Sequence, residues 1–486
     1  MPREPRLLKL WLPFVLCIAS SIPARAAPTA GPPPAAQPMA PASEALGIPA
    51  ARKISLAEAL AYARAHQPAV LAALARVRQE KANAEVPRAQ YYPLIGVTGQ
   101  LLGGTTNNTT ASYLTTPFVE LPRIGGTPSA TADSATWRPR ASTLAAVGGN
   151  QEIFDFGRIA AEAAAADALT AVAGHSAAAV ALDIELNVEE SYYAVHAAKG
   201  IFQASEDAYE RSLVHRDFAR AGVKSGLRSP IELTRAEADL SRFDTGRIRA
   251  RGGVAAAEAV LAAAVGWPEL ALDASDEAPT PASMPALSEA IQLANQKDPR
   301  LQEALARLRA QELETRAIGA LLRPDIQLSA ALSGRAGGAI PSSGPGDETS
   351  GSGFVPNVPN WDAALVLSWP LLDPTINARQ RASRAAEEVQ RAQIDFVRQQ
   401  VVAAVERAYV DVAVSRDALP SLQHELEAAR ANYAQADARF KAGLGTSVEL
   451  ADAEALRTDA EIRLALGTFE LAKARAAFAR AIAESL

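Results

Sequence analysis

The chain has very little cysteine and few aromatic residues. Only Cys17 carries a thiol, and aromatic residues make up 5% of the 486 positions. One cysteine excludes an intrachain disulfide framework and a cysteine-based metal site. With so few large rings, a core must be built by close approach of helices that carry small side chains. His175, His196 and His215 fall along one predicted helix without paired ligand spacing, so we expect no metal site.

Other features that the sequence lacks exclude further classes of protein. After the first 26 residues no apolar run reaches about 18 residues, so we expect no membrane-spanning helix. The sequence has no glycine-rich phosphate loop followed by lysine and no catalytic triad, so we expect neither an enzyme nor a bound cofactor. The formal net charge of −6 argues against a nucleic-acid partner.

The N-terminus has the pattern of a secretory signal. Arg3, Arg6 and Lys9 precede the apolar stretch "LWLPFVLCIA", and Ala-Arg-Ala at 24–26 offers the small residues that a signal peptidase recognises. Cleavage after Ala26 would remove four basic residues and one acidic residue. The formal charge of the mature chain would then be about −9.

An alternative for the N-terminus is a lipid anchor on Cys17. The residue before it, Leu16, is bulkier than the small residue that normally precedes a lipidated cysteine. Cleavage after Ala26 is the favoured prediction, and both alternatives imply export.

Two segments of the chain occur twice. "SGLRSPIEL" at 225–233 matches "AGLGTSVEL" at 442–450, with an offset of 217. "LAEALAYARAHQP" at 56–68 matches "LSEAIQLANQKDP" at 287–299, with an offset of 231. Because the matches come in the same order in both halves, the sequence indicates a tandem duplication.

Four segments predict β-strands. Apolar and polar residues alternate in 324–334 and 361–370, which is the period of a strand, and 92–104 and 142–154 hold the corresponding places in the first half with weaker alternation. Four strands with open edges are unstable in lipid, because each unpaired backbone group there costs several kcal/mol. Several chains closing one barrel would remove those edges; a small soluble sheet packed on a helical bundle is the alternative.

The strands are followed by two long predicted helices, 157–224 and 375–441. In the second, apolar residues follow alternating spacings of three and four, broken only by Ser415, which is the pattern of a coiled-coil seam. The first keeps the same phase with smaller residues and one charge, Arg216. A helix of 68 residues would form a rod of about 100 Å. We expect Pro420 to interrupt and kink the second rod. After each Gly-Leu turn a shorter helix is predicted to run back along the long one, at 229–265 and 447–484. The seam of the second rod comprises Val401, Val405, Ala408, Val412, Ser415, Leu419, Leu422, Leu426, Ala429, Tyr433, Ala436 and Phe440.

Each half therefore contains an opening helix, two strands, a long helix, a turn and a returning helix. The opening helices are expected at about 54–90, where Ser55 is the predicted cap, and at 287–322. The predicted divisions are a signal peptide (1–26), a Pro/Ala-rich flexible segment (27–52), repeat 1 (53–266), a linker (267–286) and repeat 2 (287–486).

The chain resembles the TolC-type outer-membrane efflux proteins, the exit ducts of tripartite exporters in Gram-negative bacteria. The resemblance covers about residues 53–485. It depends on the duplicated opening, on "EIFDFGRIAAE" at 152–162, and on the two turns of the form GL-x-(S/T)-x-(I/V)-E-L.

The resemblance implies a homotrimer. Its fold would be mostly α-helical, with a transmembrane 12-stranded β-barrel in outer-membrane lipid continuous with an α-helical barrel in the periplasm. The loops at about 105–141 and 335–360 would face outward. The tips Gly226-Leu227 and Gly443-Leu444 would meet a periplasmic adaptor that serves an inner-membrane transporter of the RND or ABC type. Such a protein is a passive duct.

The resemblance also implies a gate at the inner end. Acidic residues just after the second turn line the narrow entrance in the family, and the matching positions are Glu449 and Asp452, with Glu232 as the counterpart in repeat 1. Ordinary solvated helix charge is the alternative for all three. Well-known members carry an arginine where this chain has Gly445, so we hypothesise that Arg228 supplies the latch cation to Glu232 or Glu449 of a neighbouring helix.

Two other functions remain open from the sequence. A periplasmic adaptor also has a long helical hairpin, although it carries one hairpin rather than two. A structural periplasmic coiled coil would leave the alternating strands unexplained. The sequence specifies neither the cargo nor the class of pump.

Overall fold

The computed structural model describes residues 51–104, 137, 140–268, 272–275, 284–337, 355 and 358–484. The predicted signal peptide, nearly all of the Pro/Ala-rich segment, most of the linker and most of the two outward loops lie outside the described residues.

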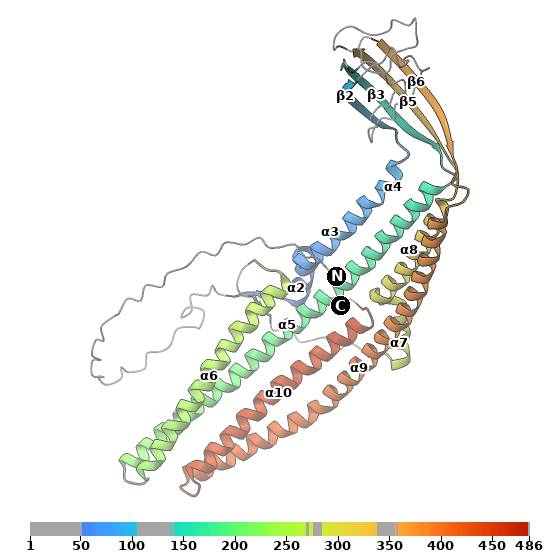
Figure 1. Cartoon of the computed structure of the whole chain (residues 1–486). Coiled ribbons are helices and arrows are strands. Elements are labelled where there is room, and N and C mark those ends of the chain that lie inside the picture. Colours follow the sequence, from blue (N-terminus) through green and yellow to red (C-terminus); the bar gives the residue numbers. More distant parts are fainter. Residues whose placement is uncertain are drawn as a thin grey trace, which may run out of the picture. The chain divides into compact units, whose positions relative to one another are not determined.

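The four predicted strands form one antiparallel sheet (Figure 1). They are β2 (Leu94–Gly104), β3 (Arg140–Phe154), β5 (Asp325–Gly337) and β6 (Val358–Ser368), and they lie in the order β2-β3-β5-β6. Each half contributes a hairpin, and β3 and β5 join the halves. In this sheet β2 and β6 each have one neighbouring strand, so two edges of the sheet are open.

One face of the sheet is apolar and exposed. The register places Val97, Val147, Leu332 and Trp361 in a row across the four strands, with exposed fractions of 74, 44, 59 and 76%. The described helices pack against one another rather than across this sheet. The soluble alternative requires the apolar face to be covered, and the structure leaves it uncovered. The opposite face carries polar side chains around a small buried cluster of Leu144, Ala146 and Ala331. The polar residues are Thr98, Gln100, Asn150, Ser329, Ser333 and Asp362.

The long helices form two hairpins with the returning helices. Helix α5 (Arg158–Lys224) packs against α6 (Pro230–Val265), and α9 (Pro374–Lys441) packs against α10 (Ser447–Ala481). Every seam position predicted in α9 is buried or half-buried, as the coiled-coil pattern requires. The expected interruption at Pro420 is wrong, because α9 remains helical through that residue. A proline whose ring lies on the exposed side of a packed helix costs one backbone hydrogen bond, and the neighbouring turns keep the helix intact.

The opening helices are broken where single helices were expected. The first divides into α2 (Leu56–His66), α3 (Pro68–Asn83) and α4 (Glu85–Ala89). The second divides into α7 (Leu287–Lys297) and α8 (Pro299–Ala320). The breaks at Gln67 and Asp298 each precede a proline, whose ring disfavours the helical conformation of the residue before it. The break at Ala84, between α3 and α4, does not precede a proline. Ser55 is the predicted cap of α2 and forms a capping box with Glu58.

Two equivalent cores stabilise the halves. In the first, Val188 and Val195 of α5 pack with Ala59 and Ala63 of α2. The second core contains the equivalent residues of repeat 2. Val405 and Val412 of α9 correspond to the two valines at the offset of 217, and Ala290 and Ala294 of α7 correspond to the two alanines at the offset of 231. A short parallel pair of strands, β1 (Arg52–Ile54) with β4 (Leu272–Ala274), covers the first core and was not predicted from the sequence.

Among the described helices, α5 alone is long and apolar enough to cross a membrane by length and composition. One such helix is weak evidence for a membrane span. Helix α5 contacts α3, α6, α8 and α10 along its length, and 17% of its apolar window is buried within the single chain.

Candidate functional site

The two Gly-Leu turns have the same backbone geometry. Gly226 and Gly443 have φ values of +75° and +73°, a left-handed conformation that glycine adopts without steric cost. The Leu227 N–H donates to the Gly222 carbonyl at 2.9 Å, and the Leu444 N–H donates to the Arg439 carbonyl at 2.9 Å. These bonds define a Schellman motif, which ends a helix by satisfying its last carbonyls.

The leucines at the turns point away from the protein. Leu227 is 84% exposed and Leu444 is 76% exposed. In a Schellman motif the residue at this position usually packs back on the helix. Two neighbouring apolar tips without that packing are suited to contact with another molecule.

Arg228 connects the two hairpins next to the turns. Its Nη2 donates to the main-chain oxygen of Phe440 in α9 at 2.6 Å, and its guanidinium lies 3.9 Å from the centre of the Phe440 ring. Its Nη1 donates to Glu232 Oε2 at 2.8 Å. Glu232 therefore is a partner of Arg228, as hypothesised, but it lies four residues further along the same segment rather than on a neighbouring helix.

The acidic residues after the second turn face outward. Glu449 and Asp452 are exposed on the first turns of α10, and Thr446 caps this helix by accepting from the Glu449 N–H. The Glu449 carboxylate lies 3.9 Å from the Arg439 guanidinium of its own hairpin. Within this chain Arg228 pairs with Glu232, one of the two alternative partners of the hypothesis. The Glu449 and Asp452 side chains both remain available to solvent or to another subunit.

Gly445 stands where the resemblance leads one to expect an arginine. A Cβ at this position would lie 3.2 Å from the Cβ of Arg439 and 3.2 Å from the Phe440 nitrogen. Any larger residue therefore requires the end of α9 to shift.

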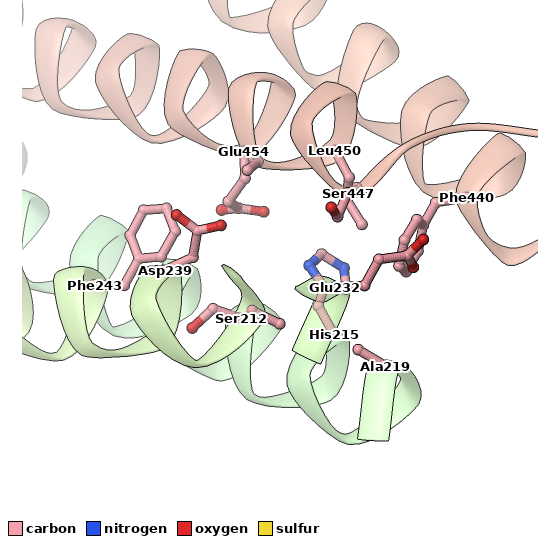
Figure 2. Close-up of a pocket in the computed structure, with 12 residues that line it drawn as sticks. Ser212, His215, Ala219, Glu232, Asp239, Phe243, Phe440, Ser447, Leu450 and Glu454 are labelled. Atoms are coloured by element: carbon pink, nitrogen blue, oxygen red, sulfur yellow. The ribbon is translucent and has the colours of Figure 1, made fainter. Parts of the chain in front are cut away.

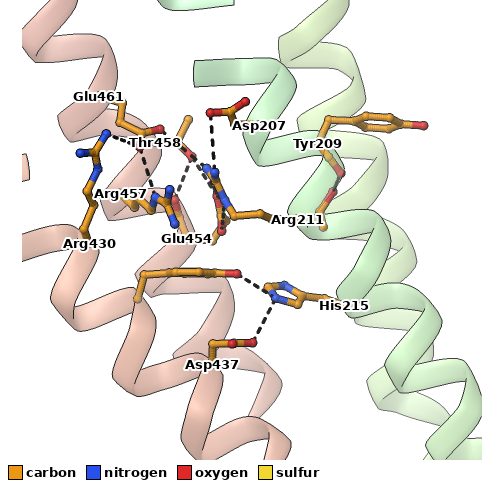
Figure 3. A network of polar contacts seen from close by, with 12 residues as sticks. Asp207, Tyr209, Arg211, His215, Arg430, Asp437, Glu454, Arg457, Thr458 and Glu461 are labelled. Atoms are coloured by element: carbon orange, nitrogen blue, oxygen red, sulfur yellow. Dashed lines mark hydrogen bonds and ion pairs between the residues drawn. The ribbon is translucent and has the colours of Figure 1, made fainter. Parts of the chain in front are cut away.

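A buried polar network joins the hairpins further from the turns (Figure 3). Arg211 of α5 donates through Nε to both carboxylate oxygens of Glu454 in α10, at 2.9 and 3.0 Å. The Glu454 side chain is 1% exposed, and Thr458 also donates to it. Glu461 lies 3.7 Å from Arg211 and pairs with Arg457. The sequence did not lead us to this network, although a glutamate four residues after Leu450, and therefore on the same apolar helix face, is a detectable signal.

The same network contains a histidine. His215 Nε2 lies 3.0 Å from the Tyr433 hydroxyl and 3.6 Å from Asp437 Oδ1. Burial lowers the pKa of His215, so the ring is neutral at neutral pH and its contact with Tyr433 is a hydrogen bond. Burial and the charge of Glu454 raise the pKa of Tyr433 to about 12.

A small cavity of about 30 Å³ lies between the network and the turns (Figure 2). It is bounded by all four hairpin helices, with Ala219 from α5, Phe243 from α6, Phe440 from α9 and Leu450 from α10. Helix packing is therefore looser on this side of the Arg211–Glu454 pair. Among the described residues no group of three or more histidine, cysteine or acidic residues is arranged to hold a metal ion.

A sheet with an exposed apolar face, continued by two long helical hairpins, is the architecture of an outer-membrane channel. The model of the outer membrane efflux protein family matches residues 59–267 and 290–484. The chain belongs to this family and is an outer-membrane protein with a helical part in the periplasm. This membership decides against the adaptor and the structural coiled coil.

Individual relatives agree with this assignment. The chain is 27% identical over 465 residues to protein CyaE of Bordetella pertussis strain Tohama I, covering 92% of this chain and 88% of that protein. The fold is similar to the outer-membrane channel OprN, with a TM-score of 0.68 at 19% identity over 88% of this chain and 90% of that one. It is also similar to the open MtrE channel of Neisseria gonorrhoeae, with a TM-score of 0.66 at 16% identity over 88% and 89% of the two chains.

Proposed function

We propose that three copies of this protein form a passive exit duct of a tripartite exporter. The observation that carries the proposal is the sheet, whose apolar face is exposed and whose two edges are open. In lipid the exposed face is favourable, whereas unpaired edge groups are not. Closing β6 of one copy on β2 of the next would pair every edge. Three copies would give a 12-stranded barrel with the polar face turned to the lumen.

The helical hairpins would continue this barrel into the periplasm. Leu227 and Leu444 are the exposed apolar tips that an adaptor would contact, and an inner-membrane transporter of the RND or ABC type would supply the energy. Glu449 and Asp452 are exposed at the same end. Threefold symmetry would arrange them as two carboxylate rings at the entrance, with Arg228 and Glu232 holding the turns in place.

Two measurements test the duct. Outer-membrane extracts analysed by electrophoresis are expected to show a trimer band that converts to a monomer on heating. The purified trimer is expected to give single-channel conductance in planar bilayers. A protein that is monomeric and water-soluble without detergent would overturn the proposal.

A further inference from the structure

The two hairpins of one chain are joined by ionic or polar contacts at several levels, including His215 with Tyr433, Lys473 with Glu190 and Arg480 with Asp183. Two further contacts lie on either side of the cavity. Close to the turns, Arg228 donates to the Phe440 carbonyl. About 20 Å back along α5 from its end at Lys224, at 1.5 Å per residue, Arg211 binds Glu454. The two levels differ in how easily they can be broken.

The outer contact is the weaker of the two. Phe440 offers Arg228 a neutral carbonyl, and Glu232 of the same segment shares the guanidinium. A hydrogen bond is roughly twice as strong when its donor or its acceptor is ionised, and an arginine is the ionised donor at both levels. Only the inner contact has a carboxylate as acceptor. The Glu454 side chain is 1% exposed and accepts from both Arg211 and Thr458, so separation would leave Arg211 and Glu454 without their partners in a buried place.

The packing between the two hairpins also differs on the two sides of the Arg211–Glu454 pair. Beyond the Arg211–Glu454 pair, α5 and α10 approach so closely that a Cβ on Gly200 would lie 3.0 Å from the Cβ of Ala465. On the side of the turns, the cavity between Ser212, Asp239 and Leu450 separates the helices. Close-packed helices resist displacement, whereas a cavity leaves side chains without contact on one side.

We infer that Arg211 and Glu454 are positioning residues that form a pivot between the hairpins. On the turn side of the pivot the hairpin ends separate when the entrance opens, and beyond it the helices stay packed. The inference rests on the proposed duct, because it assigns the place from which the entrance moves. Neither residue lies at the turns.

Spin-label distances at two depths test the pivot in the assembled protein. One pair of introduced cysteines, Lys224→Cys with Ala442→Cys, reports the turn side. A second pair, Gln203→Cys with Leu466→Cys, reports the packed side. All four positions are exposed. Arg228→Ala releases the outer contact in both labelled proteins.

The pivot predicts different responses at the two depths. Arg228→Ala is expected to shift the turn-side distances to longer values and to leave the packed side unchanged. Adding Arg211→Gln is expected to lengthen the packed-side distances as well. Arg211→Lys, which keeps a cation facing Glu454 and Glu461, is expected to leave the packed-side distances close to those of the parent. Arg220→Gln, which removes an exposed pair within the first hairpin, is the matched control and should move neither pair.

Two results would overturn the pivot. In the first, Arg228→Ala lengthens both distances equally; in the second, Arg211→Gln leaves the packed side as it is in the parent. Planar-bilayer recording of the same labelled protein separates this failure from failure of the duct. If the labelled parent conducts but the spin-label distances do not follow the predicted pattern, the pivot alone is rejected. If the parent does not conduct, the duct is rejected. If Arg211→Gln does not assemble, Glu454→Gln, which keeps the shape of the side chain, provides the same comparison.

Discussion

Arg228 and Phe440 lie 212 positions apart in the sequence, yet the guanidinium of one donates to the main-chain oxygen of the other at 2.6 Å. The contact joins the first turn to the last residues of α9. The arginine also lies over the aromatic ring, an arrangement that stabilises a cation through the charge distribution of the ring. One side chain thereby holds the tips of both hairpins together.

Removing this contact is expected to loosen the entrance. Arg228→Ala should raise the closed-state conductance of the trimer in planar bilayers, because the Phe440 carbonyl loses its charged donor. Arg220→Ala serves as the control, since Arg220 is similarly placed on the first hairpin but pairs only with Glu237 among the contacts described. Closed-state conductance that stays at the parent level in Arg228→Ala would exclude the latch role.

The acidic pair after the second turn is expected to set ion selectivity. Glu449 and Asp452 are three residues apart and lie on one helix face, and rings of carboxylates attract cations. Glu449→Ala with Asp452→Ala should reduce cation selectivity and blockage by multivalent cations in single-channel recordings. Asp417→Ala, an exposed acidic residue in the middle of α9, should leave both properties unchanged. Unaltered selectivity in the double variant would assign these residues to ordinary helix charge.

The turn glycines are expected to be sensitive to a single methyl group. Gly226→Ala and Gly443→Ala should each lower the free energy of unfolding by about 1–2 kcal/mol, because a Cβ is unfavourable in the left-handed conformation. Gly252→Ala in α6 is the matched control. It has open space around it and should stabilise its helix by about 0.5–1 kcal/mol. Chemical denaturation of the detergent-solubilised protein measures all three, and equal effects at the three sites would contradict the turn geometry.

Acid is expected to weaken the network around His215. Its pKa is lowered in the folded protein, so folding favours the neutral ring. The stabilisation is present above the ordinary histidine pKa of about 6.5 and is lost as the pH falls below it. Protonation of His215 would also place a positive charge near Arg211 and Lys441, and their repulsion lowers its pKa. Glu454 and Asp437 attract that charge and act in the opposite direction.

Thermal unfolding between pH 5 and pH 7.5 measures this effect. His215→Asn is expected to reduce the difference between the midpoints at the two pH values. His424→Asn is the control, because the His424 side chain is 81% exposed on α9. The same pH difference in His215→Asn and in the parent would show that other groups cause the acid sensitivity.

Sequence periodicity predicted the secondary structure closely where local chemistry sets it. The strands and long helices lie within a few residues of their predicted positions, because alternation and seam spacing are properties of one segment at a time. The breaks at Gln67 and Asp298 were missed although each precedes a proline. Each opening helix was predicted to be continuous, although the residue before a proline disfavours the helical conformation.

Partners that lie far apart in the sequence could not be predicted in the same way. Arg228 was singled out because of its place beside the turn, but its contacts with Phe440 depend on how the hairpins pack. The parallel pairing of β1 with β4 also escaped notice, since each strand has three residues and too little pattern to detect.

The sequence by itself determined the duplication, the alternation that leaves one sheet face apolar, and the glycines that end the long helices. These follow from local sterics and from the spacing of apolar residues. Only the tertiary structure decided which charges meet. Arg211 and Glu454 are 243 residues apart, and their pairing depends on α5 and α10 lying side by side, with enough burial to make an isolated charge unfavourable.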